Sequence, residues 1–170
     1  VSETRSPMHY TAVLAKKENP EYITVFIGPC LAKRKEGLDD PNVDYVLSAE
    51  EIGAIFMAKE IDIGSCEPLE CGEQPTTTGR NFAQSGGVAE AVRVRLKNPE
   101  RLRPAVINGL DLAGMKQLKA YGKAAAEGKA CDANLVEVMA CLGGCIAGPS
   151  VITNPKVAAV QLKKYVSLGK

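Results

Sequence analysis

The sequence predicts an α/β fold in which a mostly parallel sheet is flanked by helices. Short apolar runs typical of strands are separated by helical segments of about ten or more residues, which implies right-handed crossovers between parallel strands. The chain has 170 residues and 45% hydrophobic content, enough to bury one core. It contains no internal repeat and no low-complexity segment. We therefore expect a single domain over residues 1–170.

Four elements are expected in the first third of the chain. They are a helix at 3–17 that ends at Asn19-Pro20, strands at 22–27 and 43–47, and a helix that begins at Ser48. The run YITVFI at 22–27 is continuously β-branched and aromatic, which is typical of a parallel strand covered on both faces. Ser48 with Glu51 three positions later predicts a capping box.

The remaining elements follow a long loop predicted at 64–80, which contains two prolines and three glycines. They are a helix at 88–96 after Gly86-Gly87, a strand at 105–107, a helix at 111–127, a strand at 135–139 and a helix from Pro155 through Val166. Asp111 is the expected N-cap of its helix and Gly128 its stop, and Asn154-Pro155 is a cap followed by proline at the first helical position.

The charge balance excludes several classes of partner. Twenty-one basic and twenty acidic residues give a formal charge of +1, so no broad electrostatic footprint for nucleic acid or anionic lipid exists. The first ten residues hold no signal-peptide core, and no apolar run approaches the roughly 20 residues of a membrane span. We expect a cytoplasmic chain that binds neither nucleic acid nor membrane.

Six cysteines in 170 residues are too dilute for a disulfide scaffold, so clustered thiols indicate metal ligands or redox groups. Cys131 follows a lysine- and alanine-rich helix and is interpreted as an ordinary residue near a helix end. Cys66 and Cys71 lie in the long loop, where two interpretations stay open: surface thiols, or a functional loop. The candidate ligands are the remaining three, Cys30, Cys141 and Cys145.

These three cysteines follow the carboxyl ends of predicted strands, where ligands of open α/β sheets bind. Cys30 follows the strand at 22–27, and Cys141 and Cys145 follow the strand at 135–139 in a glycine-rich turn. Soft thiolates and glycines that allow close backbone approach predict an iron-sulfur pocket. Lys33 could bring a positive charge to it, although Lys33-Arg34-Lys35 can also be read as a solvated basic run.

The iron-sulfur hypothesis has two alternatives and needs a fourth ligand. Zinc and a redox dithiol are disfavoured because three residues, not two, separate Cys141 from Cys145. A cluster normally takes four ligands. The fourth could be Cys66 or Cys71, an exogenous group, or a residue outside this chain.

Two segments resemble cysteine signatures of the di-iron (FeFe) hydrogenases. The pattern PCxxKxxE is matched by Pro29, Cys30, Lys33 and Glu36. The pattern ExMxCxxGCxxG is matched at every fixed position between Glu137 and Gly148. Weaker similarities are Ser6-Pro7, SGGVAEA at 85–91 and VING at 106–109. The chain thus resembles the C-terminal part of the catalytic domain, which would be one lobe of the H-cluster domain.

The resemblance implies specific roles for these residues. Cys30, Cys141 and Cys145 would ligate a 4Fe-4S cubane, and Cys145 would bridge it to a di-iron subsite, the two together forming the H-cluster. Lys33 would donate to a cyanide ligand of that subsite and so act in catalysis. Met139 would pack near the cluster, with a buried core methionine as the alternative. The implied reaction interconverts hydrogen with protons and electrons.

The departures from the family pattern imply a fragment. The first cysteine signature and the ferredoxin-like cluster motifs are missing, so partners would be an N-terminal part with ferredoxin-like domains and an electron carrier such as ferredoxin. Gly28 stands where typical catalytic members have a methionine, Met8 where they tend to have a polar amide, and Pro149 where many have glycine. These changes resemble divergent or sensory branches of the family. The fragment alone is expected to be inactive. The alternative function is a noncatalytic 4Fe-4S or hydrogen-sensing protein of the same scaffold.

Overall fold

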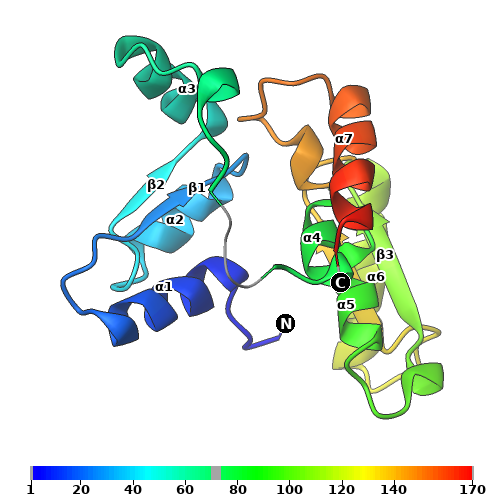
Figure 1. The fold of residues 1–170 in the computed structure, drawn as a ribbon. Coiled ribbons are helices and arrows are strands. Elements are labelled where there is room, and N and C mark those ends of the chain that lie inside the picture. Colours follow the sequence, from blue (N-terminus) through cyan, green and yellow to red (C-terminus); the bar gives the residue numbers. More distant parts are fainter. Residues whose placement is uncertain (1, 70–73, 170) are drawn as a thin grey trace. The chain divides into compact units, whose positions relative to one another are not determined.

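The computed structural model describes residues 2–69 and 74–169, and the chain divides into two compact units (Figure 1). Unit 1 comprises Val1–Glu67 with Pro149–Ile152, and unit 2 comprises Pro68–Gly148 with Thr153–Lys170. Each unit is described by itself below. The prediction of one domain over residues 1–170 concerns their mutual arrangement and stays a prediction.

Unit 1 is built on a parallel pair of strands. Its elements are α1 (Pro7–Glu18), β1 (Val25–Ile27), α2 (Ala32–Leu38), β2 (Tyr45–Leu47), α3 (Ala49–Ala58) and the 3-10 turn η1 (Ile63–Ser65). Val25 pairs with Tyr45 and Ile27 with Leu47. The first helix begins four residues later than predicted, and α2 was not predicted as a helix. The capping box of α3 is confirmed, because Ser48 and Glu51 exchange side-chain and backbone hydrogen bonds.

One face of the β1–β2 sheet carries the core of unit 1. Met8 and Ala12 of α1 are buried with Val43, and Phe26 and Val46 pack against them. The prediction that the first strand is covered on both faces is wrong, since Val25 and Ile27 are 46% and 50% exposed. Phe26 and Val46 face this cluster, and alternate side chains of a strand point to opposite faces of the sheet.

Unit 2 is a second parallel pair with more helices. Its elements are α4 (Thr77–Arg80), η2 (Asn81–Ala83), α5 (Gly87–Arg93), η3 (Pro99–Arg101), β3 (Pro104–Asn108), α6 (Leu112–Ala126), β4 (Leu135–Met139), η4 (Cys145–Ala147) and α7 (Pro155–Ser167). The N-caps Asp111 and Asn154 are confirmed by their side-chain hydrogen bonds. Part of the predicted loop at 64–80 is helical in η1 and α4, and Cys71 lies outside the described residues.

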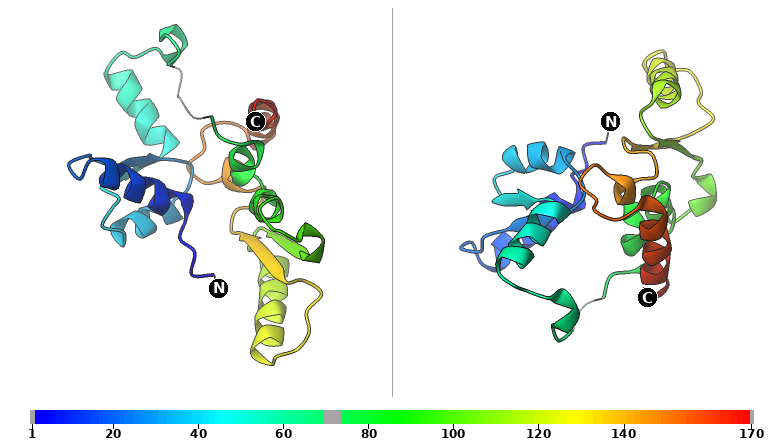
Figure 2. Two further views of the ribbon diagram at one scale, coloured as in Figure 1. Left: turned by 60° about the horizontal axis from the view of Figure 1, so that its bottom comes forward. Right: turned by 90° about the horizontal axis from the view of Figure 1, so that it is seen from above.

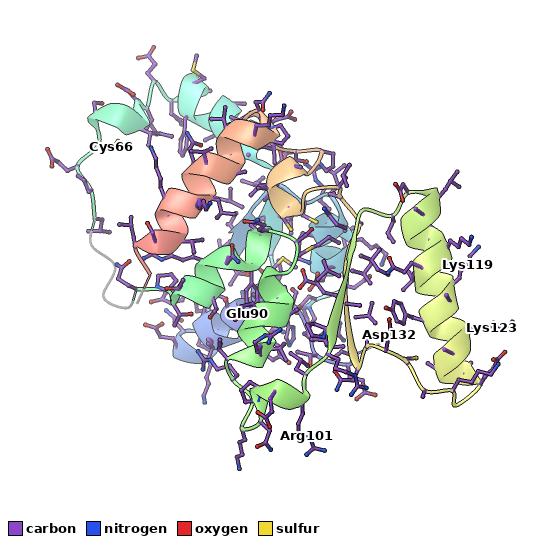
Figure 3. All side chains as sticks on the ribbon, turned by 90° about the vertical axis from the view of Figure 1, so that its right-hand side faces the viewer. Cys66, Glu90, Arg101, Lys119, Lys123 and Asp132 are labelled. Atoms are coloured by element: carbon purple, nitrogen blue, oxygen red, sulfur yellow. The ribbon has the colours of Figure 1, made fainter. Side chains whose placement is uncertain are left out.

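Strands β3 and β4 lie side by side and organise unit 2 (Figure 2). Pro104 pairs with Leu135 and Asn108 with Met139. The ladder continues beyond the strands, because the N–H of Gly109 donates to the carbonyl of Met139 at 2.8 Å. Ile107, which is 1% exposed, lies in the core beneath α6, the helix that Figure 3 shows beside the strands with Asp132 in the loop after it.

The predicted fold class is confirmed, with one difference in the sheet. Both strand pairs of the described chain are parallel and are accompanied by helices. The four strands, however, form two separate two-stranded sheets, one in each unit, rather than one sheet. Within the described chain, none of the helices combines the length and the apolar character that a membrane crossing requires.

Candidate functional site

The glycine-rich loop after β4 carries two of the predicted ligands. Cys141 is the second residue after the strand, and Cys145 begins the turn η4. The N–H of Gly144 donates to the carbonyl of Cys141 at 3.1 Å, which folds the loop back on itself. Both cysteines are half-buried. The structure therefore brings these two thiols into one short loop at the carboxyl end of a parallel strand, as predicted for the pair.

Two consecutive residues of this loop need glycine. Gly143 and Gly144 have φ angles of 93° and 84°, in the left-handed region that side chains other than glycine rarely adopt. A Cβ on Gly144 would lie 2.6 Å from the carbonyl oxygen of Ala83, so the loop lies directly against the segment before α5. The freedom that glycine allows is thus used at these two positions, whereas Gly148 has a φ of −65° and Gly28 is not in the left-handed region.

Glu137 of β4 holds the segment before α5 and the start of that helix. The side chain is buried, with its residue 8% exposed, and its two carboxylate oxygens accept hydrogen bonds from the N–H groups of Gly86 at 2.8 Å and Ala89 at 2.7 Å. A carboxylate at this end of α5 also interacts favourably with the helix dipole. Glu137 is a fixed position of the ExMxCxxGCxxG signature, but sequence reasoning did not assign it this role.

Asn108 connects the loop to the segment before α5. Its Oδ1 accepts hydrogen bonds from the N–H of Gly143 at 2.7 Å and from the hydroxyl of Ser85 at 2.8 Å. Asn108 ends β3 opposite Met139, which ends β4 and is half-buried. Sequence reasoning missed Asn108 and Ser85, although both lie in the weak similarities VING and SGGVAEA.

The other predicted ligand, Cys30, lies in unit 1 between β1 and α2. Its carbonyl accepts from the N–H of Lys33 at 3.3 Å, which opens the first turn of α2, and its side chain is half-buried. The strand before it stays in register, because the N–H of Gly28 donates to the carbonyl of Leu47 at 3.0 Å. Cys30 therefore follows the carboxyl end of a parallel strand, as predicted.

Lys33 is held by a carboxylate of its own helix. Its Nζ lies 2.6 Å from Oε2 of Glu36, and the two side chains are each 25% exposed. The hydroxyl of Ser6 donates to the other oxygen of Glu36. Burial opposes ionisation of Glu36, but the hydrogen bonds from Lys33 and Ser6 outweigh it and lower the pKa of this carboxyl below its ordinary value. Lys33 is thus anchored rather than part of a solvated run.

The two cysteine groups lie in different units. Cys30 belongs to unit 1 and follows a strand of one sheet, whereas Cys141 and Cys145 belong to unit 2 and follow a strand of the other sheet. Their convergence therefore stays a prediction. Cys66, the residue that follows η1, is exposed, with its Sγ 3.4 Å from the carbonyl oxygen of Asp62. Across residues 2–69 and 74–169, no three His, Cys, Asp or Glu residues are grouped as metal ligands.

The donor chemistry of the loop suits an iron-sulfur cluster. Thiolates are the usual protein ligands of such clusters, and backbone N–H groups near the sulfurs tune the potential. The loop offers two half-buried thiols. Its backbone is held by hydrogen bonds to Asn108 and from the ladder beside β4, and Gly144 lies close to Ala83. Cys141 and Cys145 therefore fit this group as two of its ligands.

Comparison with known proteins assigns the family. Residues 1–149 match the family described as "Iron only hydrogenase large subunit, C-terminal domain", and this chain belongs to that family. The resemblance inferred from the two signatures is thereby confirmed.

Two individual proteins show the extent of the similarity. The chain is 27% identical over 192 aligned positions to the periplasmic Fe hydrogenase large subunit of Nitratidesulfovibrio vulgaris strain Hildenborough, covering 86% of this chain and 45% of that protein. The solved structure of HydA(ΔEFG), reported for stepwise FeFe-hydrogenase H-cluster assembly, matches with a TM-score of 0.66 and 21% identity over 98% of this chain and 59% of that one. The chain thus spans about half the length of these relatives.

Proposed function

We propose that this chain forms part of the H-cluster site of an iron-only hydrogenase, with Cys30, Cys141 and Cys145 as ligands of the 4Fe-4S cubane. The observation that carries the proposal is the loop of Cys141 and Cys145, held by hydrogen bonds at the carboxyl end of β4 within a chain of this family. When bound, such a cluster supplies the electron transfer that hydrogen chemistry requires. The chain's own residues supply ligands, a closed loop and an anchored cation.

Cysteine substitution in the chain tests the ligand assignment. After reconstitution with ferrous iron and sulfide, the variants Cys30→Ser, Cys141→Ser and Cys145→Ser should each lose iron and the electron paramagnetic resonance signal of the reduced cluster. Cys131→Ser is the matched control, because Cys131 lies after α6, and it should load like the wild type. Equal loading by all four variants would refute the assignment.

Lys33 is proposed to donate to a ligand of the di-iron subsite. Support comes from its position three residues after Cys30 and from its ion pair with Glu36, which restricts its rotamers. In the full-length parent protein, Lys33→Ala should reduce di-iron content more than cubane content. Infrared bands of carbonyl and cyanide measure the di-iron content, and iron counts measure the cubane content. Equal loss of both would contradict this role.

The reaction and partners proposed for the parent protein follow from the family. It would interconvert hydrogen with protons and electrons, exchanging electrons with a carrier such as ferredoxin through ferredoxin-like domains in the part of the protein that this chain lacks. A hydrogen-uptake assay with ferredoxin on the complete protein tests the activity. A cubane signal without carbonyl and cyanide bands would indicate the noncatalytic alternative. A cytoplasmic location is also a prediction, whereas the relative is named as periplasmic.

A further inference from the structure

We propose that Asn108 is the positioning residue of the cysteine loop, a clamp that holds Cys141 and Cys145 in ligating geometry without itself binding iron. The proposal rests on the proposed function, because it assumes that these cysteines are ligands. It adds a residue that belongs to neither cysteine signature.

The first observation is the convergence of two hydrogen bonds on one oxygen. Oδ1 of Asn108 accepts from the N–H of Gly143, inside the loop, and from the hydroxyl of Ser85, in the segment before α5. The backbone N–H of Gly143 is always a donor, which assigns the oxygen of the amide to this position. One side chain therefore joins three segments: the end of β3, the cysteine loop and the approach to α5.

The second observation is that the loop needs such a clamp. Gly143 and Gly144 both have positive φ angles, and glycine is the residue with the largest conformational freedom to lose on folding. Two adjacent glycines between two ligands leave the separation of the thiols poorly determined by the chain itself. The bond from Asn108 to the N–H of Gly143 acts at the centre of this flexible stretch.

The third observation is that the base of the clamp is rigid. Asn108 is the last residue of β3 and pairs with Met139 of β4, two residues before Cys141. The segment that carries Ser85 is fixed by the buried carboxylate of Glu137, which accepts from the N–H of Gly86. Displacement of the loop would therefore break bonds to two elements that other contacts already fix.

Substitutions at position 108 test the clamp on the 170-residue chain. Asn108→Leu keeps the approximate size and removes the acceptor, whereas Asn108→Asp keeps an acceptor oxygen. Outer-shell partners of metal ligands typically change affinity by about 10- to 100-fold. We expect Asn108→Leu to release iron at about a tenth of the bathophenanthroline concentration that the wild type tolerates. Asn108→Asp should stay close to the wild type, because its Oδ1 can still accept from Gly143 and Ser85. A purely steric role would instead leave Asn108→Leu close to the wild type as well.

The metal-free chain gives a second and independent measurement. Alkylation of Cys141 and Cys145 by iodoacetamide, followed by peptide mass spectrometry, reports how often the loop opens. We expect the rate to rise several-fold in Asn108→Leu and to change little in Asn108→Asp. Cys131 in the same sample is the internal control and should react at an unchanged rate. Urea unfolding of each variant confirms that the comparison is made between folded proteins.

The outcomes separate this inference from the proposed function. A wild-type chain that takes up no iron, or a Cys145→Ser chain that loads equally well, would count against the proposed function, and the alkylation rates would then decide on the clamp. A folded Asn108→Leu chain with wild-type alkylation rates overturns the clamp, and so does an Asn108→Asp chain as reactive as Asn108→Leu. If Asn108→Leu fails to fold, Ser85→Ala takes its place, and unchanged alkylation rates there overturn the clamp.

Discussion

Substitution of Glu137 should destabilise the chain strongly, although this residue would touch no cofactor. Its carboxylate is buried and accepts two backbone hydrogen bonds, from Gly86 and Ala89. Hydrogen bonds to a charged group each contribute about 1.5–3 kcal/mol, and a buried donor left without a partner is costly. Part of this is recovered when water reaches the freed N–H groups. We expect Glu137→Ala to lower the free energy of unfolding by about 2–4 kcal/mol.

Two further variants make this expectation specific. Glu137→Gln keeps one acceptor oxygen but turns an NH₂ group toward the second N–H, so it should cost about 1–2 kcal/mol. Glu90→Ala is the matched control, because Glu90 lies on α5 with its side chain 51% exposed and paired with Arg93 (Figure 3). Exposed ion pairs contribute little, so this variant should change stability by less than about 0.5 kcal/mol.

Urea unfolding followed by far-ultraviolet circular dichroism measures these differences. A shift of the urea midpoint reports a change of stability when the dependence of the unfolding free energy on urea concentration is unchanged. A change of that dependence would indicate that a compact part of the chain unfolds separately. The reasoning is refuted if Glu137→Ala and Glu90→Ala have the same midpoint. It is also refuted if Glu137→Gln is less stable than Glu137→Ala, since the remaining oxygen should still help.

Three other predictions follow from the structure. Burial opposes ionisation of Asp40, but bonds from Asn42 and His9 hold its pKa at about 2 instead of 3.8. The folded chain therefore favours the carboxylate, which stabilises it by about 2 kcal/mol above about pH 4, a contribution lost as the pH falls toward 2. Asp40→Asn should reduce the difference between urea midpoints at about pH 5 and about pH 2, and an unchanged difference would contradict this. Arg80 is 8% exposed, lies over the Tyr165 ring at 4.2 Å and donates to the Tyr165 carbonyl at 2.9 Å. Arg80→Lys should therefore cost about 2 kcal/mol in urea unfolding, against less than about 0.5 for the exposed Arg95→Lys, and equal costs would refute the role. Gly144→Ala should cost at least about 1–2 kcal/mol, because its Cβ would meet the Ala83 carbonyl and its φ is positive; a midpoint within error of the wild type would show that the loop can move away.

Local signals in the sequence predicted much of the secondary structure. The capping box at Ser48, the N-caps Asp111 and Asn154, and the strand at 135–139 depend on neighbours within a few residues, so their physics is visible in the sequence. Helix α2 was missed for the opposite reason. Its sequence, AKRKEGL, has no apolar stripe, and its Gly37 packs closely against Val46 and Val43, a contact that sequence spacing does not reveal.

Part of the candidate site could likewise be predicted from the sequence, and part could not. The two signatures identified Cys30, Lys33, Met139, Cys141 and Cys145 as candidates, because motif spacing is a property of the chain alone. Tertiary structure decided that Ser6 holds Glu36, the partner of Lys33, that Glu137 fixes the approach to α5, and that Asn108 clamps the cysteine loop. The Glu137 and Asn108 bonds join residues 23 to 51 positions apart, and the Ser6 bond joins residues 30 apart. Partners at such separations are selected by packing of whole elements, which no local pattern of residues encodes.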